Sequence, residues 1–150
     1  QRLGRQRWGR SVILASEAAV RRHGLTPLAR LESAASGGVQ PRITGIGPVE
    51  AARRQHTHTN RAAVDHDVIE LYEAFAAQVL ACTAPGGWPT TTPGLNAHGG
   101  AIALGQPLGM SGARLAGTGA RRLAETGARS ALVMRCVGLG QGVALELRPA

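Results

Sequence analysis

The feature that most constrains the fold is a continuous apolar run at residues 131–134, which ends two residues before Cys136. An apolar run without polar alternation is typical of a strand that is covered on both faces. Strands that alternate with helices predict an α/β fold, and a short glycine-rich turn predicts an antiparallel final pair of strands. The other strand-like runs lie at 12–15, 28–35, 68–71 and 143–147, and the helix-like segments at 17–23, 48–54, 73–80 and 111–126.

The spacing of apolar residues also predicts which side chains face the core. On the helix at 73–80 we expect Phe75 and Leu80 to be buried. On the later helix we expect Arg121 and Arg122 to point into solvent, and the same holds for Glu146 on the last strand.

Composition excludes several classes of protein. The 150 residues fit one domain, and the formal net charge is +8, carried by arginines without a single lysine. Aromatic interleaving, helix-turn-helix and zinc-finger patterns are missing, so we do not expect a nucleic-acid partner. No apolar run of about 18 residues is present, which argues against a membrane partner. No secretory signal or disulfide spacing is visible, and we expect a cytoplasmic protein.

Two stretches could hold an ion or a cofactor. Residues 53–67 are polar and contain His56, His58 and His66, and a His-x-His pair can bind metal. No acidic or thiol ligand has a supporting spacing, so we expect a solvated loop and no metal site. The glycine-rich residues 96–114 match neither a phosphate-binding loop nor the dinucleotide fingerprint, and we expect no resident cofactor.

Cys136 is the strongest candidate for chemistry. It follows the buried strand and precedes a glycine-rich turn, where backbone N–H groups can converge on an oxyanion. A thiol whose pKa is modestly tuned can donate and accept protons. Many free cysteines, however, are simply small buried apolar residues. The residues alone leave both interpretations open.

Three blocks of the sequence resemble the thiolase family, in the family's order. YEAFAAQ (72–78) is similar to its Asn-Glu-Ala-Phe block, NAHGGAIALGQPLGMSGAR (96–114) to its Gly-His-Pro block, and RCVGLGQGVALEL (135–147) to its Cys-x-Gly-x-Gly block. The resemblance implies a thiolase-like C-terminal domain at 11–150, preceded by a non-family leader at 1–10. It further implies a five-stranded mixed sheet with helices on both faces.

The resemblance also implies site residues. Cys136 matches the acid/base cysteine of an acyl transfer between CoA thioesters, and Gly138 matches the glycine whose N–H holds the thioester oxygen. Gln106 stands where the family has its histidine, and Tyr72 stands where it has its asparagine. Glutamine cannot take up a proton near neutral pH. The family's nucleophile lies in an N-terminal half, so we expect this chain alone to be inactive.

Two further expectations concern partners and origin. An acyl-CoA would bind only together with a complete N-terminal half, and we expect a homo-oligomer or pairing with a thiolase chain. The alternative is a non-catalytic interaction module that pairs with a thiolase subunit or N-terminal half. Residues 1–10 and 87–93 can be encoded so that a shifted reading frame gives family-like strings, which suggests a frame-shifted or truncated gene product.

Overall fold

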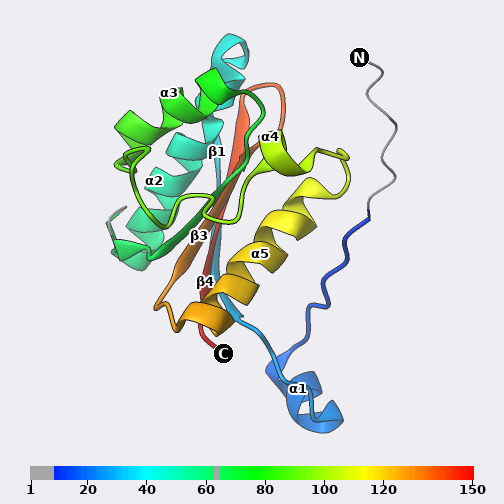
Figure 1. Cartoon of the computed structure of the whole chain (residues 1–150). Coiled ribbons are helices and arrows are strands. Elements are labelled where there is room, and N and C mark those ends of the chain that lie inside the picture. Colours follow the sequence, from blue (N-terminus) through cyan, green and yellow to red (C-terminus); the bar gives the residue numbers. More distant parts are fainter. Residues whose placement is uncertain (1–8, 63–64) are drawn as a thin grey trace.

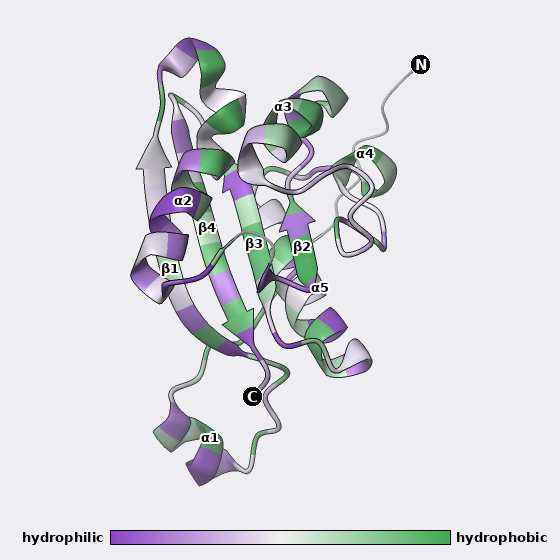
Figure 2. Ribbon diagram, turned by 90° about the vertical axis from the view of Figure 1, so that its left-hand side faces the viewer, coloured by the Kyte–Doolittle hydropathy of each residue, from purple (hydrophilic) through white to green (hydrophobic). Residues whose placement is uncertain are grey.

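The computed structural model describes residues 9–62 and 65–150. In this part of the chain four strands form one sheet in the order β1-β4-β3-β2 (Figure 2). The pairs β1–β4 and β3–β4 are antiparallel, whereas β2 and β3 run parallel. The mixed sheet and the antiparallel final pair are therefore confirmed. The strands are β1 (Arg30–Gly38), β2 (Val68–Leu71), β3 (Ala131–Cys136) and β4 (Gln141–Arg148).

The prediction of five strands is wrong because residues 12–15 form no strand. They have no regular secondary structure, and Ile13 is 89% exposed. A short apolar run becomes a strand only when a neighbouring strand accepts its backbone hydrogen bonds, and the described residues offer none here. Beyond β2, the sheet is continued only by a single parallel bridge between Ile69 and Leu95.

Helices cover both faces of the sheet, as expected. The helices α2 (Gly47–Thr59) and α3 (Ala76–Gly86) lie on one face, and α5 (Ser111–Thr126) lies on the other (Figure 1). Helix α1 (Glu17–His23) is capped by Ser16 and ended by a left-handed Gly24, but it buries no residue. Two short helical segments complete the described chain, η1 (Pro41–Ile46) and α4 (Ala101–Leu104).

The core is divided by the sheet into two clusters. Leu132 and Met134 of β3 pack toward α2 and α3, whereas Val133 packs with Leu115 and Leu123 of α5. The apolar run at 131–134 is thus buried on both faces, which confirms its interpretation as a doubly covered strand.

Glu146 and Arg122 contradict the predicted solvent faces. Glu146 is fully buried: its Oε2 accepts a hydrogen bond from Gln55, and its Oε1 forms ion pairs with Arg61 and Arg148. Arg122 is buried as well and donates to Glu70, another fully buried carboxylate. The spacing of apolar residues gave the wrong direction for these two side chains. A buried charge is tolerated when an opposite charge is buried with it, and here the opposite charge lies far away in the sequence.

Two helices differ from their predicted bounds, and two apolar side chains from their predicted direction. The segment predicted at 73–80 begins only at Ala76, so that Phe75 is its 74% exposed N-cap, and Leu80 is also exposed. Helix α2 runs on to Thr59, through residues expected to form a loop. Most of the leader, residues 1–8, lies outside the described residues. No helix in the described ranges is long and apolar enough to cross a membrane.

Candidate functional site

Tyr72 and Cys136 lie next to each other where the two parallel strands end. Tyr72 directly follows β2, and its N–H donates to the carbonyl of Met134 on β3 at 2.9 Å. Cys136 is the last residue of β3, and both side chains belong to the same buried cluster. Ligand sites of α/β proteins commonly lie at the carboxyl ends of parallel strands.

The thiol of Cys136 is held in its protonated form. Its side chain is only 7% exposed, and this burial raises the pKa of the Cys136 thiol, while a backbone hydrogen bond and the charge of Arg135 oppose the shift. A neutral thiol that is shielded from water can donate a proton to a developing carbanion, and it becomes a base once it has done so.

Tyr72 is stacked against a positive charge. The guanidinium carbon of Arg135 lies 5.4 Å from the centroid of the Tyr72 ring, within the range of a cation–π contact. Burial raises the pKa of the Tyr72 phenol, which Cys136 also raises and Arg135 lowers. The phenol is therefore a neutral hydroxyl at physiological pH.

Gly138 lies in the turn between β3 and β4. Its carbonyl accepts the Gln141 N–H at 2.9 Å, whereas its own N–H forms no hydrogen bond with any described residue. The turn is fixed at its tip by a hydrogen bond from the Gly140 N–H to Thr44 Oγ1 at 3.0 Å. The Gly138 N–H is thus a free backbone donor in a hydrogen-bonded turn, two residues after Cys136. A backbone N–H of this kind can stabilise an oxyanion.

Gln106 lies in the loop between α4 and α5 and is half-buried. Its side chain forms no hydrogen bond with Tyr72, Cys136 or any other residue in the described ranges. The loop is anchored at its start, where Gly105 donates to the carbonyl of Ala101, a member of the cluster that contains Tyr72 and Cys136. The structure therefore brings Tyr72 and Cys136 together but does not connect Gln106 to them.

Two residues that support the site were missed at the level of sequence. The amide of Asn96 donates to Glu73 Oε1 at 2.8 Å, and Glu73 Oε2 accepts the Ile102 N–H at 2.9 Å. Asn96 also pairs with both backbone groups of Leu71 at the end of β2. Glu73 and Asn96 thus connect β2 to α4. Their positions inside the blocks 72–78 and 96–114 were the available signal.

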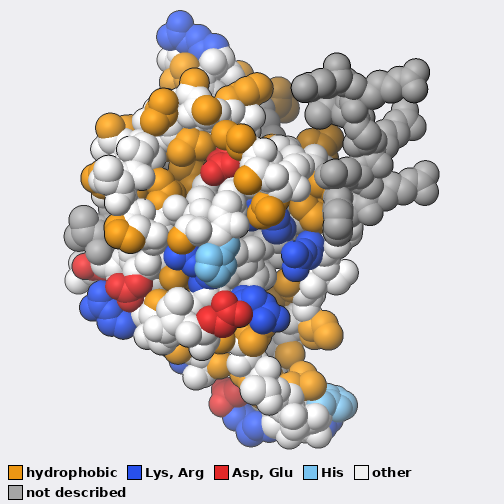
Figure 3. All heavy atoms as spheres, viewed as in Figure 1, with side chains coloured by type: hydrophobic (Ala, Val, Ile, Leu, Met, Phe, Trp, Pro, Cys, Tyr) orange, Lys and Arg blue, Asp and Glu red, His pale blue; other side chains and the backbone are white. Residues whose placement is uncertain are grey.

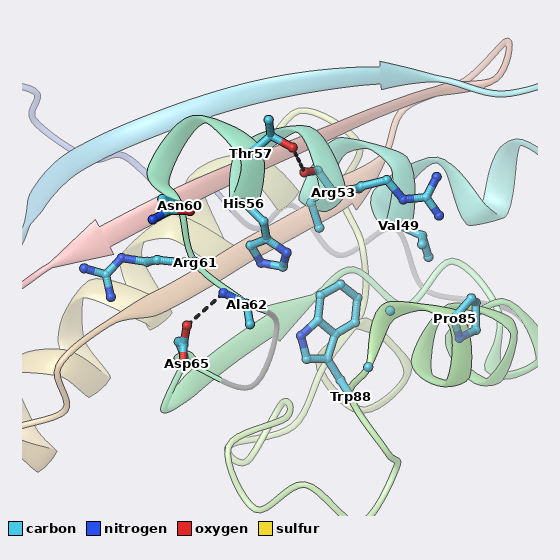
Figure 4. Close-up of a pocket in the computed structure, with 13 residues that line it drawn as sticks. Val49, Arg53, His56, Thr57, Asn60, Arg61, Ala62, Asp65, Pro85 and Trp88 are labelled. Carbon is cyan, nitrogen blue, oxygen red and sulfur yellow. Dashed lines mark hydrogen bonds between the residues drawn. The ribbon is translucent and has the colours of Figure 1, made fainter.

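A cavity lies elsewhere, between α2, the residues that follow it and the end of α3 (Figure 4). It has a volume of about 820 Å³, and none of Tyr72, Gln106, Cys136 and Gly138 lines it. His56 points into it beside Trp88 and contacts His66 with an Nε2–Nε2 distance of 3.2 Å. His58 is exposed and takes no part. The described residues contain no group of three ligands for a metal ion.

Comparison with known proteins decides the family. A family model described as "Thiolase, C-terminal domain" matches residues 25–148. This chain belongs to the thiolase family. The thiolase domain is 53% identical over 137 residues to a beta-ketoadipyl-CoA thiolase of Pseudomonas putida and 42% identical to an acetyl-CoA acetyltransferase of Cupriavidus necator. Each alignment covers 91% of this chain but 34% of the relative.

Solved structures agree with this assignment. Human mitochondrial 3-ketoacyl-CoA thiolase superposes on the thiolase domain with a TM-score of 0.84 at 39% identity, and its complex with CoA superposes with a TM-score of 0.86. Both alignments cover 91% of this chain and 34% of the human one. The resemblance seen in the three sequence blocks is confirmed, and the chain spans about a third of the length of the relatives it matches.

Proposed function

We propose that this chain supplies the acid/base half of a thiolase site, which transfers an acyl group from a 3-oxoacyl-CoA to CoA and releases acetyl-CoA. The family and the names of the relatives support the reaction class. The thiolate of a nucleophilic cysteine from an N-terminal half would attack the 3-oxo carbon, the C2–C3 bond would break, and the cysteine would leave the cycle again as a thiolate. Cys136 would give its proton to C2 of the departing acetyl-CoA and then take the proton of the incoming CoA thiol, which attacks the thioester.

One observation carries this proposal: a buried thiol and a backbone N–H without a hydrogen-bond partner among the described residues stand two residues apart at the end of β3. The thiol matches the proton transfer, and the Gly138 N–H matches the stabilisation of a thioester oxygen. Gln106 would still donate a hydrogen bond to an oxyanion, but its amide cannot act as a base.

The reaction is tested by acetoacetyl-CoA cleavage in the presence of CoA. We expect no turnover above buffer from the chain alone. After coexpression with the part of the Pseudomonas putida relative that precedes its C-terminal domain, the Gln106→His variant should turn over. Replacing Cys136 by alanine in that variant should lower the rate by at least about a hundredfold, the usual contribution of general acid–base catalysis. Turnover by the isolated chain that depends on Cys136, or a rate that Cys136→Ala leaves unchanged, would contradict the proposal.

A second candidate function is favoured by the surface at the same end of the sheet. Hydrophobic side chains gather there over α3 and α4 (Figure 3). The turn after Cys136 adds Leu139, which is 84% exposed and has a φ of 52°. A bulky residue with positive φ is unusual, and its exposure is difficult to explain in an isolated domain. The exposed apolar residues of these elements are Phe75, Leu80, Ile102, Leu104, Leu108, Val137 and Leu139.

This surface fits a non-catalytic interaction module that docks on another thiolase chain. Helix α5 does not contribute its leucines to this surface, because Leu115 and Leu123 are buried against the sheet. Stable coelution with the Pseudomonas putida partner without any turnover, even for Gln106→His, would favour the module over the acyltransferase. Turnover of the coexpressed pair favours the acyltransferase.

A further inference from the structure

The cavity beside α2 continues into a second pocket at the end of the sheet that lies opposite to Cys136. Arg129, which precedes β3, and Arg148, which ends β4, line this second pocket, whereas Cys136 ends β3. The volumes are about 820 Å³ for the cavity and about 380 Å³ for the second pocket. Both volumes are in the range of small-molecule sites. The two share three lining residues, Asn60, Arg61 and Asp65.

Arginines dominate the charge of this combined pocket. Among the described residues that line it, Asp65 is the one with an acidic side chain. The fully buried Glu146, which pairs with two of the arginines, lies outside the lining. The wall is therefore more positive than a count of ion pairs suggests. The arginines that line the pocket are Arg53, Arg61, Arg129 and Arg148.

Three of these guanidiniums keep N–H groups that bond to no described residue. Arg61 reaches Glu146 through Nε at 3.2 Å, and both of its Nη atoms stay free. Arg129 holds Asp67 through Nε and Nη2, which leaves Nη1. Arg148 pairs with Glu146 through Nε at 2.8 Å and donates from Nη1 to the Arg129 carbonyl at 3.0 Å, which leaves Nη2. Guanidiniums that are fixed by one partner and retain free donors are suited to binding a multiply charged anion.

The larger cavity adds an apolar wall to this cluster of donors. Val49 and Ala52 of α2 and Pro85 at the end of α3 line it (Figure 4). The ring of His56 stands between the helices, edge-on to the buried Trp88 at a centroid distance of 6.4 Å. The combined pocket is thus apolar between α2 and α3 and rich in guanidinium N–H groups beyond the end of α2.

We propose that the combined pocket binds a phosphate monoester with a compact apolar body. The phosphate would accept hydrogen bonds from Arg61, Arg129 and Arg148, and the body would lie between α2 and α3. A phosphate monoester offers three terminal oxygens and close to two negative charges, so it matches three guanidiniums better than a carboxylate does. The pocket does not contain Cys136, and the proposal is independent of the proposed function.

The site is tested by calorimetric titration of the whole chain with phenyl phosphate. Inorganic phosphate and phenol serve as comparison ligands, because each of them carries one of the two recognised parts. We expect saturable binding of phenyl phosphate, at least about tenfold tighter than binding of inorganic phosphate, since a ring buried between α2 and α3 adds apolar contact. Phenol should bind at least about tenfold more weakly than phenyl phosphate, because it lacks the charge-assisted hydrogen bonds.

Two arginine variants test whether the phosphate lies where the guanidiniums meet. Arg129→Gln should weaken binding of phenyl phosphate about tenfold, the effect of losing one hydrogen bond to a charged group. Arg121→Gln is the matched control and should leave the affinity unchanged. The Arg121 side chain is 67% exposed and pairs with Glu125, as the 76% exposed Arg129 pairs with Asp67. Absence of saturable binding of phenyl phosphate, equal affinity for inorganic phosphate, or equal affinity of Arg129→Gln and the unchanged chain would overturn the proposal.

Discussion

At the scale of single residues, the His56–His66 pair makes stability depend on pH. The hydrogen bond between the two Nε2 atoms requires that at least one ring is neutral. Burial, with smaller contributions from His56 and Arg61, lowers the pKa of His66 to about 4, although Asp65 and Asp67 act in the opposite direction. Burial also lowers the pKa of His56, against Glu146 and Asp65.

The lowered pKa of His66 determines how stability changes with pH. Below its ordinary pKa of 6.5, His66 takes up a proton in the unfolded chain but not in the folded one, so stability falls as the pH drops from about 6.5 to about 4. The His66 contribution to this loss should be about 3 kcal/mol. Urea unfolding at several pH values checks this: His66→Phe should flatten the profile, and His58→Gln should not. An equally steep profile in His66→Phe would contradict the assignment.

The sequence blocks predicted that Tyr72 and Cys136 lie together, and the structure confirms this neighbourhood. The roles of both residues stay predictions. The stacking of Arg135 on Tyr72 could not be predicted, since it depends on β2 pairing with β3 across more than sixty residues of sequence.

At the scale of elements, a buried ion cluster fastens α5 to β2. Arg122 donates to Glu70 Oε1 at 3.0 Å, and Arg114 lies 3.8 Å from Glu70 Oε2. Removing Arg122 would leave a buried carboxylate without its closest partner, so Arg122→Met should cost about 3 kcal/mol of unfolding free energy. The neighbouring Arg121 pairs with Glu125 in solvent, and Arg121→Met should cost under about 1 kcal/mol. Chemical denaturation of both variants provides the comparison, and equal losses would contradict the role of the cluster.

The bounds of α5 could be predicted from the sequence, but the direction of its buried arginine could not. The boundaries of α5 follow from its helical period and from Gly127, whose φ of 67° ends the helix. The inward direction of Arg122 does not follow, because only the tertiary position of Glu70 makes it favourable. The apolar residues at 12–15 similarly carry a strand pattern, but no described strand accepts their backbone hydrogen bonds.

At the scale of the whole molecule, the thiolase domain presents its candidate site beside exposed apolar residues. Its core is complete on both faces of the sheet, since α2 and α3 cover one face and α5 covers the other. Of the 14 exposed large apolar residues among those described, seven lie on or beside α3, α4 and the turn after Cys136, and the other seven lie at residues 12–14, 25–31 and 43. In the proposed shared site, another chain would cover the seven at this end of the sheet.

In the proposed function, this end of the sheet is one half of a shared site. The most direct test is coelution of the coexpressed Pseudomonas putida partner with two aspartate variants. Aspartate tolerates the positive φ of Leu139. Leu139→Asp should therefore keep the turn and abolish coelution. Leu25→Asp, also exposed but near α1, should leave coelution intact. Coelution that survives Leu139→Asp, or that is lost only in Leu25→Asp, would contradict the claim.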